Sequence, residues 1–200
     1  MKLWPLLTCL LAACGGGGGG GGGGEVVDPR VSLLNSYDGI VSRVAGDPDR
    51  GLPGMAPAPA AAFTLRGIVL YEGTAALVIE GADPRILRGA SSLLVDFETS
   101  TGNGTIDGVF RIANGVPTAD YDGALTLTLE GLRAGTDGLI VAYGGTLAGE
   151  GVTYGFDGLM TGEILGDDAE ALMAVDYDAE IVSGGRLLDG IVLLVAEEVR

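Results

Sequence analysis

The sequence contains no histidine, so the side chains that could do chemistry are carboxylates, tyrosines, arginines and two cysteines. Ser-His and Cys-His nucleophilic mechanisms and histidine metal sites are therefore excluded. Two closely spaced carboxylate pairs, Asp120 with Asp122 and Asp176 with Asp178, could supply a general acid and a general base. Such carboxylates more often lie in turns or at strand ends, facing water. No spacing matches an EF-hand calcium loop, so we expect no metal site. Because the acidic residues are expected to face water, we also expect no catalytic residue and no resident cofactor.

The tyrosines, methionines and arginines could each contact a ligand. Met160 and Met173 could ligate haem iron, although methionine more often fills gaps in a core. Five tyrosines could form a partner-binding surface, although packing inside the fold is their more frequent role; they are Tyr71, Tyr121, Tyr143, Tyr154 and Tyr177. Four arginines are expected at solvated positions that balance an acidic surface, namely Arg66, Arg85, Arg88 and Arg111.

Cys14 is the residue whose surroundings indicate the most specific chemistry. Before it lie one positive residue, Lys2, and an apolar run at positions 3–13. This is the layout of a secretory signal peptide, and the run is too short to span a bilayer. The tetrapeptide Leu11-Ala12-Ala13-Cys14 resembles the lipobox of bacterial lipoproteins. The resemblance implies that residues 1–13 are removed, that the Cys14 thiol receives a diacylglyceryl group, and that a fatty acyl chain such as palmitate caps the new amino group.

The segment after Cys14 indicates how a lipid anchor would connect to the rest of the chain. Several acyl chains, at about 0.8 kcal/mol per buried methylene, give stable membrane attachment. Ten glycines follow at positions 15–24, and such a run has no side chains to bury and maximal backbone entropy. We therefore expect residues 14–24 to be the lipidated cysteine and a flexible tether of roughly 17–19 Å. Gly15 lacks the aspartate that retains some lipoproteins in the inner membrane, which favours the outer membrane.

The charge of the chain limits its partners. There are 27 acidic and 11 basic residues, which gives a net charge of −16. Nucleic acid demands a basic surface, and anionic lipid attracts basic segments, so we expect no nucleic acid and no membrane contact apart from the anchor on Cys14. An acidic surface keeps an exported protein soluble and could steer a basic partner. Cys14 would be the only cysteine after cleavage, so the core must be stable without disulfides.

Residues 25–62 are predicted to be a linker or the remnant of a small handle domain. Asp38-Gly39 is a turn signal, and a series of prolines follows at positions 48, 53, 57 and 59. From residue 63 to residue 200 the chain alternates apolar and polar residues, which indicates strands with one buried face. Met173, Val175 and Tyr177 are predicted to share a buried face, with Asp176 on the opposite side.

The alternation predicts eight or nine strands, because the first two could be one bent strand; they are 64–71, 75–80, 88–97, 104–112, 123–131, 138–148, 151–161, 171–181 and 186–196. No helix of ten or more residues is expected after residue 60. Asp-Gly pairs suit type I′ hairpin turns or, inside strands, mark bulges and bends; they begin at positions 107, 122, 137, 157 and 189. Such a meander most simply closes on itself. The expected fold is an all-β, eight-stranded antiparallel soluble barrel that follows a disordered signal and glycine tether.

A membrane barrel of this size is the alternative fold. Its lipid-facing wall would need an apolar band flanked by aromatic girdles. The chain has only six tyrosines and four phenylalanines and ends in Glu197-Glu198-Val199-Arg200. A lipid anchor would also be redundant for a protein that already spans the membrane. The soluble barrel is therefore the favoured fold.

Residues 94–97 end a predicted strand in Val-Asp-Phe, and residues 102–108 follow as a glycine-rich turn and a Gly-x-Ile-x-Gly strand. This succession resembles the transferrin-binding protein B-like lipoproteins, and the resemblance extends over residues 63–196. The segment Tyr154–Glu163 is similar to a later glycine-rich strand, and Leu165–Glu170 to a Gly-Pro-x-Ala-x-Glu element that has lost its proline. The ending, from Gly184-Gly185 through Gly190-Ile191-Val192, is similar to the closing strand.

The resemblance implies an eight-stranded soluble barrel on an outer-membrane lipoprotein, carried to the cell surface by a dedicated translocator. Members bind host transferrin, other host proteins or haem. We therefore expect a non-enzymatic lipoprotein, on the cell surface or facing the periplasm, that binds a protein or a small ligand. The alternatives are a structural envelope lipoprotein without a ligand and a carboxylate-based hydrolase. Binding predicts exposed apolar or tyrosine-rich residues at one barrel rim, whereas the structural role predicts a uniformly acidic surface.

Overall fold

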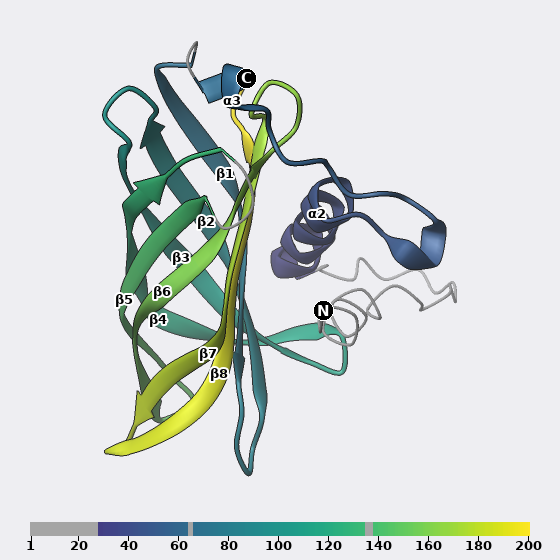
Figure 1. Cartoon of the computed structure of the whole chain (residues 1–200). Coiled ribbons are helices and arrows are strands. Elements are labelled where there is room, and N and C mark those ends of the chain that lie inside the picture. The colour runs from purple at the N-terminus through teal and green to yellow at the C-terminus, as the bar shows by residue number, and fades with distance from the viewer. Residues whose placement is uncertain (1–27, 64–65, 135–137) are drawn as a thin grey trace.

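The computed structural model describes residues 28–63, 66–134 and 138–200, and Cys14 and the glycine tether lie outside them. Eight strands form one closed antiparallel barrel, in which sequence neighbours pair and β1 closes the ring against β8 (Figure 1). The strands are β1 (Ile68–Ile79), β2 (Arg85–Asp96), β3 (Thr101–Ala113), β4 (Val116–Leu132), β5 (Leu139–Gly149), β6 (Val152–Leu165), β7 (Ala171–Ser183) and β8 (Arg186–Glu198). The predicted eight-stranded antiparallel barrel is confirmed, and the first two predicted segments form one strand, β1.

The core lies inside the barrel. In β4, Leu125, Leu127 and Leu129 are buried, while Thr126 and Thr128 between them are exposed. Apolar side chains from all eight strands pack in this way into one interior cluster. A membrane barrel has the reverse arrangement, with an apolar band on its outer wall. Among the residues that the structure describes, no helix is long and apolar enough to cross a membrane.

Glycines at one end of the barrel make tight hairpins, and glycines within the strands allow bulges. Three turns place two successive residues at positive φ, as a type I′ turn requires; they are Asn114-Gly115, Glu150-Gly151 and Gly184-Gly185. Asp107-Gly108 and Asp157-Gly158 lie inside β3 and β6, at places where the pairing register shifts. Their role as strand bulges is therefore confirmed over their role as turns.

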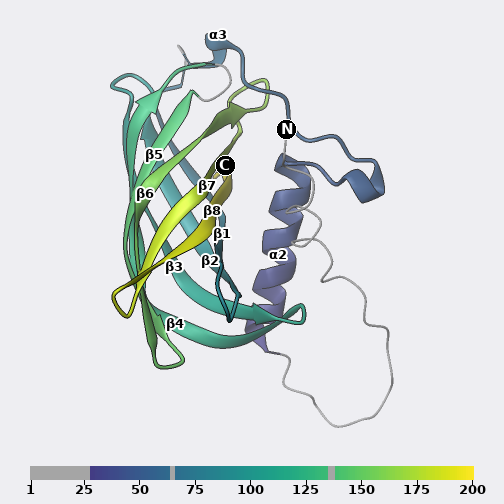
Figure 2. The same cartoon turned by 60° about the horizontal axis from the view of Figure 1, so that its bottom comes forward.

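A helix, α2 (Pro29–Val44), lies in the segment predicted to be a linker or the remnant of a handle domain, and it runs through the turn signal at Asp38-Gly39. The side chain of Asp28 caps the helix by accepting the N–H of Arg30, and Pro29 fits the first helical position. Four apolar residues at helical spacing form its buried stripe: Leu34, Tyr37, Val41 and Val44. The expected turn was wrong because this stripe packs against the outer wall of the barrel, along which α2 runs (Figure 2).

Two further short elements connect α2 to the barrel. A 3₁₀ turn, η1 (Pro48–Arg50), follows α2, and α3 (Ala60–Phe63) lies at the upper end of the barrel in Figure 1. The ring of Phe63 meets that of Phe97 edge-on, with centroids 5.4 Å apart. Ala58 is buried against the interior cluster, and its N–H donates to the carbonyl of Ile164. The segment before β1 therefore covers this end of the core.

Candidate functional site

The carboxylates with predicted acid–base potential do not form a pair. Asp176 lies on the inner face of β7 and accepts a hydrogen bond of 2.7 Å from the Tyr143 hydroxyl. Asp178 is exposed, and its backbone N–H donates to Asp176 Oδ1 across a bulge in β7. Burial, and then the charge of Asp176, raise the pKa of Tyr143, so the phenol stays protonated as the donor. Asp176 is therefore held by a structural hydrogen bond.

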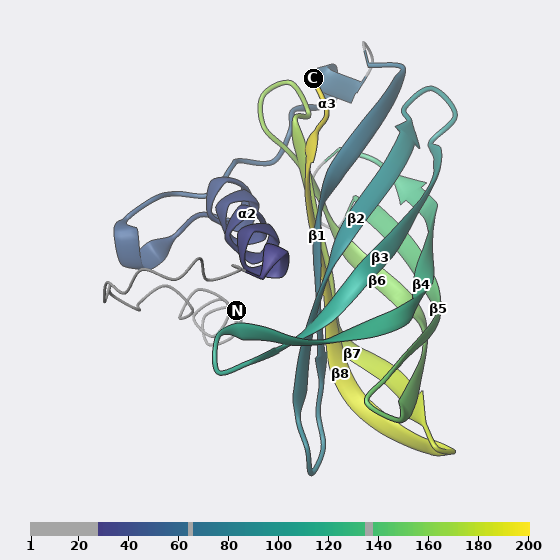
Figure 3. The same cartoon turned by 180° about the vertical axis from the view of Figure 1, so that it is seen from behind.

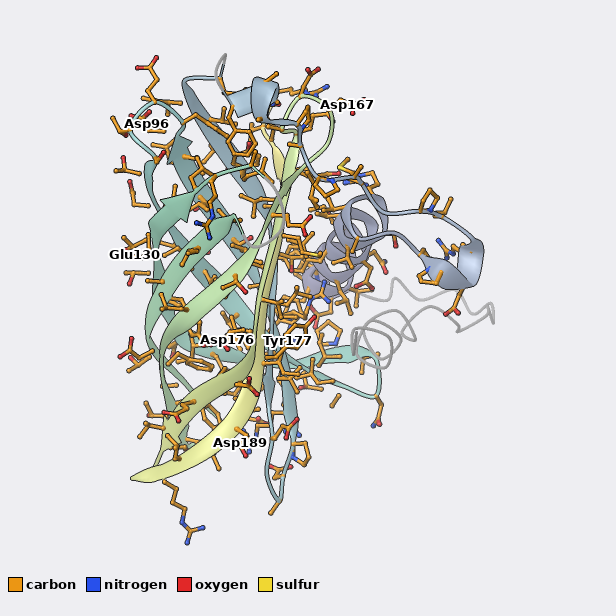
Figure 4. All side chains as sticks on the ribbon, in the orientation of Figure 1. Asp96, Glu130, Asp167, Asp176, Tyr177 and Asp189 are labelled. Carbon is orange, nitrogen blue, oxygen red and sulfur yellow. The ribbon has the colours of Figure 1, made fainter. Side chains whose placement is uncertain are left out.

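The face predicted for β7 was wrong. Leu172 and Ala174 are the residues that point into the barrel, whereas Met173 packs on the outer side, and Tyr177 is exposed. Figure 4 labels Asp176 and Tyr177, which are neighbours on this strand. The residues of β7 that face the interior include the apolar ones on either side of the bulge. Asp176 also lies on this face, because the Tyr143 hydroxyl donates a hydrogen bond to it.

The other carboxylate pair faces water. Asp120 is exposed and forms an ion pair of 2.9 Å with Arg30 at the start of α2, and Asp122 is also exposed. Within residues 28–63, 66–134 and 138–200, no group of three or more histidines, cysteines or acidic residues could hold a metal ion.

Four of the five tyrosines considered as a binding surface lie in the interior instead, namely Tyr71, Tyr121, Tyr143 and Tyr154. Only Tyr177 among these five is exposed. Met160 belongs to the interior cluster, whereas Met173 packs against the cluster under α2. These two methionines lie on opposite faces of the wall, so they cannot ligate the same haem iron.

Of the four arginines expected at solvated positions, only Arg88 is fully buried, so the expectation was wrong for that residue. The other three are partly exposed and pair with acids; they are Arg66, Arg85 and Arg111.

One end of the barrel is closed by an aromatic and ionic network around Arg85. Its guanidinium donates to the Tyr121 hydroxyl at 2.6 Å and to Glu150 Oε2 at 2.9 Å, and it lies 5.9 Å from the ring centre of Tyr154. Arg111 donates to the same Glu150 carboxylate. Hydrogen bonds from Tyr121 and Arg111 outweigh the opposing effect of burial and lower the pKa of Glu150.

The opposite end of the barrel is closed by the loop between β6 and β7. Ala169 in this loop is fully buried at a positive φ of 55°. Its carbonyl accepts hydrogen bonds from the Tyr71 hydroxyl at 2.6 Å and from Arg66 at 3.1 Å. Arg66 also pairs with Glu198 near the end of β8. With α3, these contacts cover the interior at this end of the barrel.

Four exposed apolar residues gather on the outer wall near this end, and we call them the rim patch: Ile68, Leu70, Leu94 and Val199. Leu70 pairs with Leu94 across β1 and β2, and the Val199 N–H donates to the Leu70 carbonyl. Their exposed fractions lie between 36% and 68%. The sequence carried a signal for this patch, because three successive apolar residues in a strand, such as 93–95, must direct one of them outward.

Arg88 is the fourth arginine and lies on the outer wall beneath α2. Its side chain is almost fully buried, and its Nη2 atom lies 3.4 Å from Asp38 Oδ1 on the helix. Nothing in the local sequence marks this contact, because the two residues come from separate elements.

No protein-family model matches this chain, and no curated protein matches it. The resemblance to transferrin-binding protein B-like lipoproteins therefore stays a prediction that rests on its own motifs.

Proposed function

We propose that this chain is an exported, non-enzymatic lipoprotein, anchored in the outer membrane through Cys14, whose barrel binds a partner protein with its outer wall. The observation that supports the binding role is the rim patch, which is exposed on the outer wall of a barrel whose interior is filled by packed side chains. The interior is packed with apolar side chains, and both of its ends are covered, so it offers little to a small ligand. A row of exposed apolar residues on a strongly acidic protein is a feature of interaction surfaces.

The chemistry of the patch favours a partner with an apolar contact surface and basic surroundings. Leu70 and Leu94 supply apolar area, and Glu72 and Asp96 follow them on the same outer face of β1 and β2. The net charge of −16 would speed the approach of a positively charged partner. By resemblance, that partner is a host protein that carries iron or haem, and a surface-lipoprotein translocator exports the barrel. A structural envelope role without a ligand is the alternative.

Lipid attachment is tested by growing producing cells with labelled palmitate. The wild-type chain is expected to incorporate label, and Cys14→Ser to incorporate none. Cys9→Ser is the matched control, because this cysteine lies inside the proposed signal peptide and should leave labelling unchanged. Label on Cys14→Ser, or none on the wild type, would contradict the proposed anchor.

Surface display and binding are tested together on intact cells. Protease added outside should remove the barrel if it faces the medium and leave it intact if it faces the periplasm. Material that copurifies with the wild type should be lost from a Leu70→Glu/Leu94→Glu variant and kept by a Thr126→Glu/Thr128→Glu variant, which adds the same charge to an exposed part of β4. Equal binding by the two variants would exclude the rim patch as the site.

A further inference from the structure

The wall beneath α2 is unlike the rest of the outer surface. Leu193, Ala76, Arg88 and Phe110 form one outward row across β8, β1, β2 and β3, in which each residue pairs with the next. Ala76, Arg88 and Phe110 are buried although they lie outside the barrel. The ring of Tyr37 on α2 stacks on that of Phe110, with centroids 6.3 Å apart. From behind, α2 is seen beside β1 and β8 (Figure 3). We call this row the covered row.

Arg88 is poorly satisfied by its helix. It is only 2% exposed, yet its Nε and Nη2 atoms have no hydrogen-bond partner among the residues that the structure describes. Asp38 Oδ1 lies 3.4 Å away, and the guanidinium lies 5.8 Å from the ring centre of Tyr37. Burial lowers the pKa of Arg88 and raises that of Asp38, so their attraction does not offset the loss of water. A buried donor without a partner requires an explanation.

The helix is held by contacts that can be released without opening the barrel. Apart from the Asp38–Arg88 pair, its polar contacts with the barrel are peripheral: Arg43 pairs with Glu197, and Arg30 pairs with Asp120 and donates to the Thr118 carbonyl. Gly39 lies in the helix interior, where glycine costs about 1 kcal/mol relative to alanine. None of the buried residues of α2 belongs to the interior core. Release of α2 would therefore uncover the row while the barrel stays closed.

We propose that the covered row is a second docking surface, for an amphipathic helix of a partner protein, and that α2 is its autoinhibitory cover. The partner helix would present an aromatic ring to Phe110, as Tyr37 does, and a carboxylate with the reach to bond both free N–H groups of Arg88. An arginine beside an aromatic ring on an apolar surface has the composition of a binding hot spot. An amphipathic helix binds a surface of this kind with its apolar face, as α2 does. This surface is separate from the rim patch and does not depend on the lipid anchor.

The test uses fluorescent peptides of residues 28–45 that carry Asp38→Glu or Asp38→Asn, added to the full chain. Val41→Asp in the chain removes an apolar contact of its own α2 and should strengthen peptide binding about tenfold over wild type. Leu33→Asp, on the exposed side of the same helix, is the matched control and should bind as the wild type does. The Asp38→Glu peptide should bind the Val41→Asp chain more tightly than the Asp38→Asn peptide. That preference should vanish when Arg88→Met is added.

Equal peptide binding by the Val41→Asp and Leu33→Asp chains, or the absence of a preference for the carboxylate peptide, overturns the proposal. Hydrogen exchange on the wild-type chain gives a second measurement that does not depend on the variants folding. The amides of α2 should open with a lower free energy than the paired amides of β1 and β8. Equal protection of α2 and these strands would show that the helix leaves only on global unfolding, and would also overturn the proposal.

Discussion

Asp176 and its neighbours show, at the scale of single residues, how the barrel holds a carboxylate on its inner face. The Tyr143 hydroxyl donates to Asp176, and Gly158 leaves the space in which the two groups meet. A Cβ atom at position 158 would lie 2.5 Å from the Tyr143 hydroxyl oxygen and 2.9 Å from Asp176 Oδ2. The glycine is therefore required by the contact on its inner side.

Gly158→Ala is expected to destabilise the barrel by about 1–3 kcal/mol, because the added methyl group overpacks this contact. Tyr143→Phe removes the hydroxyl and should cost about 1–3 kcal/mol by leaving Asp176 Oδ2 without its donor. The double variant should cost less than the sum of the two, because Phe removes the hydroxyl oxygen, which is the nearest atom that the methyl group would meet. Free energies of unfolding from urea titrations measure all three, and strictly additive costs would contradict this packing.

Glu150 is a second residue whose local conformation is explained by a distant contact. It takes a positive φ of 51° in the β5–β6 turn, where asparagine or glycine is usual. Its carboxylate binds Arg85, Arg111 and Tyr121. These partners explain why an acid is found there.

The free energy of unfolding should depend on pH through the ionisation of Glu150. Its pKa is lowered in the folded protein, so the folded state binds this proton more weakly than the unfolded state does. The stabilisation is therefore present near neutral pH and is lost as the pH falls through the lowered pKa. Wild type should be more stable than Glu150→Gln at pH 7, and the difference should shrink in acid. A difference that stays constant from pH 7 into acid would contradict this role of the Glu150 carboxylate.

The arginine contacts could not be predicted from the sequence. Arg66 and Glu198 lie 132 residues apart in the chain, and Arg85 and Glu150 lie 65 apart. Charge counts alone indicate solvated arginines, because the partners become neighbours only when the barrel closes. The lipobox predicted at Cys14 is a local motif, by contrast, so its prediction does not depend on the fold.

At the scale of elements, the strands were predictable, but α2 was not. Alternation with period two marks a strand regardless of its partners, so the strand positions followed from segments such as β4. In α2 the Asp38-Gly39 signal competes with the apolar stripe, and the stripe prevails only because an outer wall is present to bury it. The face of β7 that points inward was also predicted wrongly, because a bulge interrupts the alternation and a carboxylate, Asp176, lies on the inner face.

Gly39→Ala is expected to stabilise the docked α2 by about 0.5–1 kcal/mol, because alanine favours the helix and the position has room. The new Cβ atom would meet only the flexible end of Arg43, at 3.4 Å. Gly46→Ala is the contrasting variant, because that residue has a φ of 86° and its Cβ atom would lie 2.5 Å from the Gly54 nitrogen. Hydrogen exchange of the α2 amides should slow in the first variant and accelerate in the second. The opposite order would show that α2 docking does not follow helix propensity.

At the scale of the whole molecule, closure determines which surfaces remain for recognition. Pairing of β1 with β8 removes both free sheet edges. The covered ends and the packed interior leave the outer wall, which carries the rim patch and the row covered by α2. The barrel class could be predicted because a succession of alternating strands, with no helical pattern among them after residue 63, admits few other folds. The sequence marked single outward apolar residues such as Leu94 but not the two surfaces, because each surface combines residues that become neighbours only when the strands pair.

Site-specific photocrosslinking in intact producing cells tests the binding role most directly. A photoreactive side chain is placed at Leu94 in the rim patch, at Thr128 on the exposed face of β4, or at Leu127 in the core. A discrete adduct with one protein should form from position 94 and not from positions 128 or 127, and it should disappear when Leu70→Glu is added. Adducts that form equally from positions 94 and 128, or from neither, would contradict a partner bound at the rim patch.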